Sequence, residues 1–95
     1  MKLSEAEISA VLEAGNAARR LMANEDFLTI IDYLSTYHLQ ALVSAPVGPE
    51  GLAAREHHHT MHSALREIAS ELQGRAAAAE ELAARVDADE EDIIE

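Results

Sequence analysis

The chain has 95 residues, no cysteine, three aromatic residues and a formal net charge of −11 at pH 7. A chain of this length forms at most one small domain, and the lack of cysteine excludes disulfides, zinc–thiolate sites and thiol catalysis. Binding to a phosphate backbone needs clustered lysine and arginine, so the acidic balance argues against direct contact with nucleic acid. We expect no membrane span, because the apolar runs are far shorter than about 18 residues, and no signal peptide at the N-terminus.

The first predicted helix runs from about Glu5 to Met22. Ser4 and Glu7 have the spacing of a capping box, in which each side chain accepts a hydrogen bond from the backbone of the other. Small residues and Arg19 occupy the second half of the apolar side, so we expect looser packing there.

The second predicted helix spans residues 25–44, with Asn24 as its N-cap and two acidic residues in its first turn, where the helix dipole favours anions. Its apolar face contains Phe27, Ile30, Ile31, Leu34, His38 and Ala41. Tyr33 and Tyr37 lie four residues apart on one flank of this face. They could anchor a partner or shield the edge of the helix pair, and both interpretations remain open.

Residues 45–49 contain two prolines, which cannot continue a helix, and therefore form a connection. A third helix is predicted from about residue 50 to residue 86. Gly74 is its weakest point, at a cost of about 1 kcal/mol relative to alanine, so a break there is one alternative.

An apolar repeat along residues 58–86 is the strongest pattern in the chain. One row recurs every seven residues, and a second row is interleaved with it, which places a narrow seam on one side of the helix. Such a seam requires another helix to cover it, and its alanine flanks favour close approach in a hairpin or bundle. The first row is His58, Leu65, Leu72, Ala79 and Val86; the second is Met61, Ile68, Arg75 and Leu82.

The register of the hairpin follows from its proline-containing connection. Residue numbers at equal height along the second and third helices should sum to about 95, as estimated from the rise of an α-helix. Leu34 then lies near Met61, and the second helix ends close to Leu72. Beyond Gly74 the third helix packs on the first helix, folds back, or projects toward another molecule with Leu82 and Val86 exposed.

Six of the nine residues from Asp87 to Glu95 are acidic and none is basic. Segments of this composition are usually solvated and disordered. The predicted fold is therefore all-α: a helical hairpin or three-helix arrangement with one long C-terminal helix, forming a single domain over residues 1–86, followed by a disordered acidic tail over residues 87–95.

The histidines are the one cluster that could carry chemistry. His58 and His62 are four residues apart on one helical face, the spacing of a two-histidine metal clip, and the register places His38 opposite His57 and His58. Histidines that are partly exposed or lie at an interface are the favoured interpretation, so we assign no metal, cofactor or catalytic residue. A ferritin-like metal-binding bundle remains the alternative that rests on the histidines alone. With no nucleophile elbow and no phosphate-binding loop, we expect no enzymatic activity.

A resemblance to small all-helical proteins of tailed bacteriophages covers about residues 20–83. It is carried by Leu21-Met22-Ala23-Asn24-Glu25-Asp26-Phe27, a helix, Ala45-Pro46 with Glu50-Gly51-Leu52, and Ser63-Ala64-Leu65-Arg66-Glu67-Ile68. The resemblance implies a non-catalytic virion component or assembly factor, present in many copies, in the virion or the host cytoplasm.

Two other functions therefore remain open beside the metal-binding bundle. The favoured one is a structural or assembly protein that binds itself, or a larger head, portal or tail protein, through helix–helix contacts. The other is an acidic inhibitor that mimics nucleic acid in a basic groove, although its acidic residues are scattered rather than aligned. The interface candidates are Tyr33, Tyr37, His58, His62, Leu72, Leu82 and Val86.

Overall fold

The computed structural model describes residues 2–94, with side chains described for residues 2–88. In chain order it contains α1 (Glu5–Met22), α2 (Glu25–Ser44), the short 3₁₀ helix η1 (Pro49–Gly51) and α3 (Leu52–Ile94). The described residues include no strand, so the predicted all-α fold with a long C-terminal helix is confirmed. The chain divides into two compact units. We call Met1–Ala23 with Glu71–Glu95 the crossed unit, and Asn24–Ser70 the hairpin unit.

Both predicted N-caps are present. The Ser4 hydroxyl accepts a hydrogen bond from the Glu7 amide at 3.1 Å, and the Ser4 amide donates to the Glu7 carboxylate at 3.2 Å, which completes the capping box. The Asn24 side-chain oxygen accepts from the Phe27 amide at 2.9 Å. These contacts satisfy amides that have no partner inside the helix, and they explain why α1 and α2 begin where the sequence predicts.

The connection between α2 and α3 is held by two glycines and one arginine. Gly48 has a φ of 100°, a conformation that side chains other than hydrogen disfavour. A Cβ on Gly51 would lie 1.8 Å from the Pro46 carbonyl oxygen, so only glycine fits there. The Arg55 guanidinium donates to the carbonyls of Pro46 and, at 3.0 Å, of Gly48. The first turn of α3 therefore fixes the loop that turns the chain back.

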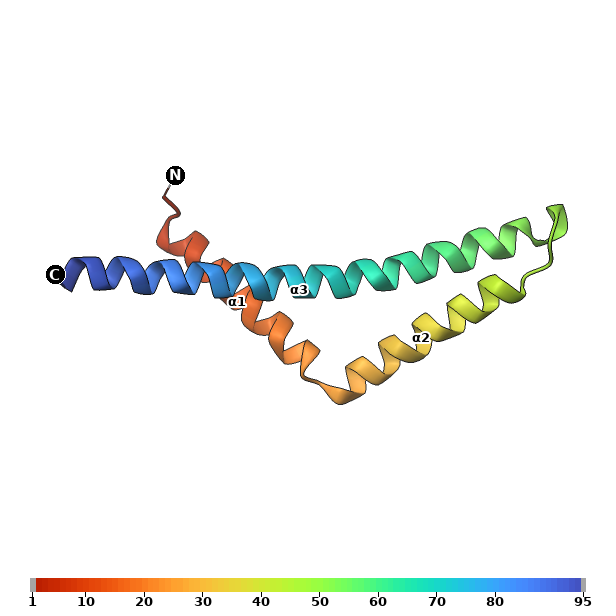
Figure 1. Cartoon of the computed structure of the whole chain (residues 1–95), viewed down its shortest axis with the longest axis horizontal. Coiled ribbons are helices and arrows are strands. Elements are labelled where there is room, and N and C mark those ends of the chain that lie inside the picture. The colour runs from red at the N-terminus through yellow and green to blue at the C-terminus, as the bar shows by residue number, and fades with distance from the viewer. Residues whose placement is uncertain (1, 95) are drawn as a thin grey trace. The chain divides into compact units, whose positions relative to one another are not determined.

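Within the hairpin unit, α2 runs antiparallel to the first part of α3, and the two helices diverge with distance from the loop (Figure 1). Leu65 is buried in this unit at 7% exposure, whereas Met61, Ile68 and Ile30 remain exposed. The hairpin is confirmed, but it leaves much of its apolar surface uncovered.

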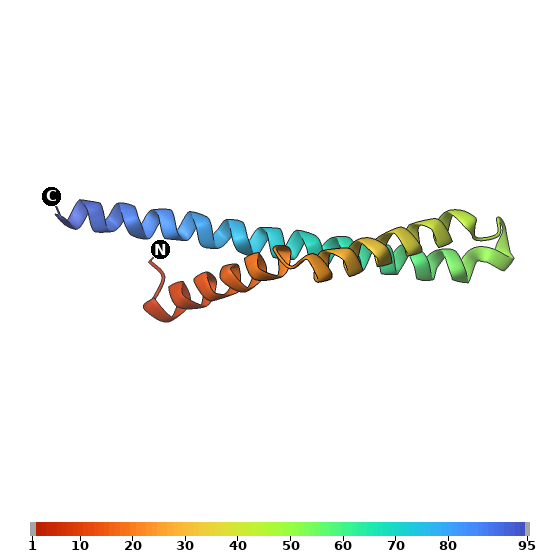
Figure 2. The ribbon, with the colours of Figure 1, turned by 90° about the horizontal axis from the view of Figure 1, so that it is seen from below.

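Within the crossed unit, α1 packs across the later part of α3 (Figures 1 and 2). A Cβ on Gly15 would lie 2.1 Å from the Cβ of Ala79, so the two backbones approach closely at this glycine. Ala18 and Ala79 are buried at 1% and 2% exposure. Arg19, expected to disturb this face, instead donates to the Ala76 carbonyl at 3.5 Å. Close approach at small residues therefore replaces a core of large side chains.

The predicted seam on α3 is right in its first row and differs in its second. His58, Leu72 and Val86 are half-buried, and Leu65 and Ala79 are buried, as expected for a row that faces another helix. In the second row, Leu82 is half-buried as predicted, whereas Met61, Ile68 and Arg75 are exposed and the half-buried positions beside them are His62 and Ala76. The first row keeps its seven-residue spacing, and the positions beside it differ along the helix because α2 packs on the early part of α3 and α1 on the later part.

Helix α3 passes through Gly74 without a break, because the flanking residues are strong helix formers. Its assigned end at Ile94 is later than the predicted end at Val86, because residues 87–94 contain neither proline nor glycine. The tail predicted to be disordered covers residues 87–95. Most of it, residues 89–95, lies outside the residues whose side chains the structure describes. None of the helices in the described residues combines the length and apolar composition needed to cross a membrane.

Candidate functional site

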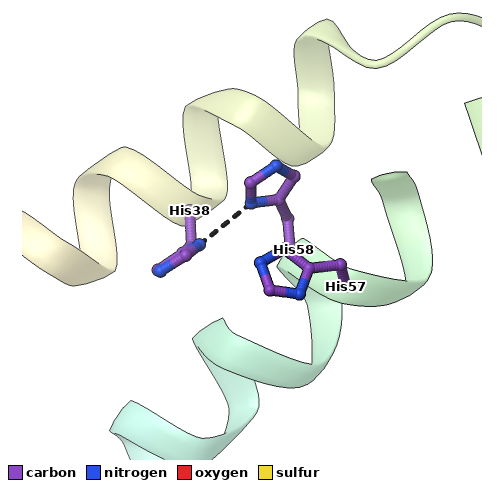
Figure 3. A group of neighbouring side chains, drawn as sticks. All are labelled: His38, His57 and His58. Atoms are coloured by element: carbon purple, nitrogen blue, oxygen red, sulfur yellow. Dashed lines mark hydrogen bonds between the residues drawn. The ribbon is translucent and has the colours of Figure 1, made fainter. Parts of the chain in front are cut away.

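Three histidines meet near the loop of the hairpin unit. His38 comes from the last third of α2, and His57 and His58 are consecutive residues in the second turn of α3. The antiparallel register places them at the same height, since 38 and 58 sum to 96, close to the predicted value of about 95. His38 is buried at 7% exposure, His58 is half-buried and His57 is exposed. We call this group the histidine cluster (Figure 3).

The three rings lie close enough to share one small ligand. Nδ1 of His38 lies 2.9 Å from Nδ1 of His58, so one ring donates its proton and the other accepts it. The ring centroid of His57 lies 4.9 Å from that of His58 and 6.0 Å from that of His38. One nitrogen from each of the three rings lies within 4.8 Å of the other two.

Tyr37 packs against the rings of the cluster. Its ring meets that of His38 edge-on at 5.0 Å between centroids and that of His58 at 5.9 Å. Edge-to-face contacts of this kind favour particular ring orientations. The interface candidate Tyr37 therefore contacts the two histidines that are hydrogen-bonded to each other, although half of its own surface remains exposed.

The environment of His38 disfavours its protonated form. Burial, and then the neighbouring imidazoles of His58, His57 and His62, lower the pKa of His38 below its ordinary value of 6.5. A positive charge on His38 would lose water and gain like-charged neighbours. The neutral ring that results can accept a proton or offer a lone pair to a ligand.

This lowered pKa predicts that the metal-free protein becomes less stable as the pH falls. His38 binds a proton more readily in the unfolded chain than in the folded one, so its contribution to stability is complete above about pH 6.5 and declines below it. Urea unfolding with a chelator present should show a lower midpoint at pH 5.5 than at pH 7.5. The His38→Gln variant should show a smaller change, because only the other groups still titrate. Equal pH dependence in the two proteins would contradict the prediction.

The structure places the other interface candidates in different surroundings. Tyr33 is exposed at 69%, the highest value among the aromatic residues of α2. His62 is half-buried but does not belong to the cluster, and the hydrogen bond of His58 is with His38 on the opposing helix. Leu72, Leu82 and Val86 are half-buried in the crossed unit. Leu82 and Val86 were expected to be exposed, but α1 covers part of this surface.

A shallow apolar groove in the crossed unit is too small to hold a typical small-molecule ligand. Its volume is about 210 Å³, whereas sites for drug-sized ligands usually enclose about 300 to 1,000 Å³. Its lining is Leu3, Val11, Ala78, Glu81, Leu82 and Arg85. The histidine cluster is therefore the better candidate for ligand chemistry.

Sequence reasoning placed His38 opposite His57 and His58 but did not identify the three as one group. Neighbouring residues on a helix point about 100° apart, so spacing alone favours His58 with His62 over His57 with His58. Only the position of His38 on the opposing helix makes a set of three. The register of the hairpin therefore indicated this group, whereas the spacing of the histidines along α3 did not.

Comparison of this chain with protein-family models, with curated proteins and with solved structures finds no match.

Proposed function

We propose that this chain is a non-enzymatic assembly protein that binds further copies of itself through helix–helix contacts. The observation that carries the proposal is how little of the apolar surface one copy buries. Among the described side chains only Ala18, Leu65 and Ala79 are buried and apolar, and no large side chain is fully buried. The large apolar side chains left exposed are Leu3, Leu21, Leu28, Ile30, Tyr33, Tyr37, Leu39, Val43, Val47, Leu52, Met61 and Ile68.

Helix α2 supports this proposal most strongly, because many of its large apolar side chains are exposed. The twelve residues from Tyr33 to Ser44 include no aspartate, glutamate, lysine or arginine. A helix that contacts a single neighbour normally has a charged face toward water. Since α3 covers one side of α2 in the hairpin unit, the apolar side chains exposed on its flank favour contact with another helix.

One exposed stripe of α2 is well suited to a second copy of the chain. Ile30, Tyr33 and Tyr37 recur at intervals of three and four residues, so they share one flank of the helix, and each is at least half exposed. Tyrosine is enriched at protein interfaces. The three side chains carry no charge, so two copies can place the same stripe face to face in a symmetric contact without bringing like charges together. We call these three residues the tyrosine stripe.

The exposed surface of α3 is charged, in contrast to the tyrosine stripe of α2. Its exposed positions carry ion pairs four residues apart, Glu71 with Arg75 at 2.9 Å and Glu81 with Arg85 at 2.6 Å. Pairs of this type add little to stability, but they are typical of a helix face in water. The uncovered apolar surface is thus concentrated on α2, and we place the self-contact there. The residue pattern shared with small helical phage proteins supports a place in a virion for the resulting assembly.

Two matched double variants test the proposal. Ile30→Glu with Tyr33→Glu puts two charges into the tyrosine stripe, and Ser63→Glu with Ser70→Glu adds the same charge to an exposed polar surface of α3. We expect light scattering to give an oligomeric mass for the wild-type chain and the serine variant. The stripe variant should be monomeric with unchanged helical circular dichroism. A monomeric wild-type chain, or an oligomer in all three proteins, would contradict the proposal and favour a different partner or surface.

A further inference from the structure

We propose that the histidine cluster is a binding site for a divalent transition-metal ion of the zinc class, formed within one chain by His38, His57 and His58. Their three nitrogens come from two helices of the same unit and lie within 4.8 Å of one another. This site goes beyond the assembly function proposed above and does not depend on it, since all three ligands belong to one hairpin.

The spacing of the nitrogens is close to that of a coordinated ion. Zinc binds imidazole nitrogen at about 2.0–2.1 Å with tetrahedral geometry, which sets its ligand nitrogens about 3.3 Å apart. The Nδ1 atoms of His38 and His58, at 2.9 Å, need to separate by only a few tenths of an ångström. Rotation of the exposed His57 ring brings the third nitrogen closer, and its exposure makes that movement easy.

The hydrogen bond between His38 and His58 shows that their Nδ1 atoms point toward each other. Two neutral imidazole nitrogens at 2.9 Å repel each other if both present lone pairs, so something positive must lie between them. In the structure that role falls to the ring proton of one histidine. A metal ion can take the same place, with both rings carrying their proton on the other nitrogen, because each ring has a second nitrogen that can hold it.

The chemistry of the donors selects the ion. The three ligands are imidazoles, without carboxylate or thiolate, a set that suits zinc, nickel, copper and cobalt and not magnesium or calcium. A neutral imidazole offers a lone pair on one ring nitrogen, as a metal ligand must. Three nitrogens leave the fourth tetrahedral position for water or a small anion.

The location of the cluster predicts what the ion does. It joins α2 to α3 close to the loop, where Arg55 already holds the carbonyls of Pro46 and Gly48. A bound ion therefore cross-links the two helices of the hairpin and stabilises the folded state, because the unfolded chain does not hold the three ligands together.

The test uses His57→Ala with His59→Ala as its matched control. Both side chains are exposed and lie in the same turn of α3, so neither substitution should disturb folding, but only His57 belongs to the cluster. Isothermal titration with zinc should give one ion per wild-type chain, at least tenfold weaker binding for His57→Ala, and less than threefold change for His59→Ala. Zinc should raise the thermal midpoint of the wild type and of His59→Ala only, and magnesium should not raise it.

A third variant, His62→Ala, separates this site from a clip formed by His58 and His62 on α3 alone. We expect His62→Ala to bind zinc within threefold of the wild type. The proposal is overturned if His62→Ala loses binding while His57→Ala keeps it, or if His57→Ala and His59→Ala lose binding equally. Half an ion per chain, or no zinc binding by the wild-type protein, would overturn it as well.

Discussion

Replacement of Leu65 by alanine is expected to destabilise the hairpin unit by about 2 to 5 kcal/mol, the range measured for buried leucines. Leu65 is the only large apolar side chain among residues 2–88 that is buried, at 7% exposure. Its truncation removes contacts that no other large side chain of the unit replaces. Because typical domains are stable by only about 5 to 15 kcal/mol, a loss of this size would unfold a considerable fraction of the protein.

Leu52→Ala is the matched control for this experiment, since it makes the same chemical change on the same helix at a side chain that is 50% exposed. Urea unfolding at one fixed protein concentration should give a loss several times smaller for Leu52→Ala than for Leu65→Ala. Equal losses at the two positions would mean that Leu65 does not anchor the hairpin and that the predicted register is wrong.

Alanine substitutions at two glycines should have opposite effects. At Gly15 a new Cβ would lie 2.1 Å from the Cβ of Ala79 and 2.9 Å from the Arg75 carbonyl oxygen, so α1 must move away from α3. Overpacking of this kind costs about 1 to 3 kcal/mol. At Gly74 a Cβ would meet nothing within 4 Å, so alanine there should stabilise α3 by up to about 1 kcal/mol through its higher helix propensity.

Thermal unfolding monitored by circular dichroism measures both changes. Gly15→Ala should lower the midpoint, because its Cβ meets α3, and Gly74→Ala should raise it, because its Cβ meets nothing within 4 Å. A neutral effect at Gly15 would show that α1 and α3 do not approach closely in solution. Destabilisation at Gly74 would show that the helix is not continuous there.

Local signals in the sequence predicted most of the fold. Ser4 with Glu7 and Asn24 marked the starts of α1 and α2, and the two prolines marked the loop, because caps and prolines act within a few residues of themselves. The heptad row from His58 to Val86 also predicted which side of α3 is buried. Its interleaved row was right only at Leu82, because the helix that packs on α3 changes from α2 to α1 along its length, and a repeat on one helix does not report that change.

The candidate site was only partly predictable for a related reason. The register placed His38 opposite His57 and His58, but pairing along α3 suggested His62 instead. A site shared by two helices depends on the distance between side chains on different helices. The spacing of residues in a sequence gives distances only along a single helix. The sequence also placed Ile30 on the apolar face of α2 that packs against α3, whereas Ile30 is exposed at 58%.

Dependence of the thermal midpoint on protein concentration is the most direct test of self-assembly as the way this chain covers its apolar surface. For a protein whose folded state is completed by other copies, stability rises with concentration by mass action. Across about a hundredfold range of wild-type concentration we expect the midpoint to rise steadily, and the variant with glutamate at Ile30 and Tyr33 to show no such rise. A wild-type midpoint that stays constant over that range, with a single cooperative transition, would contradict self-assembly.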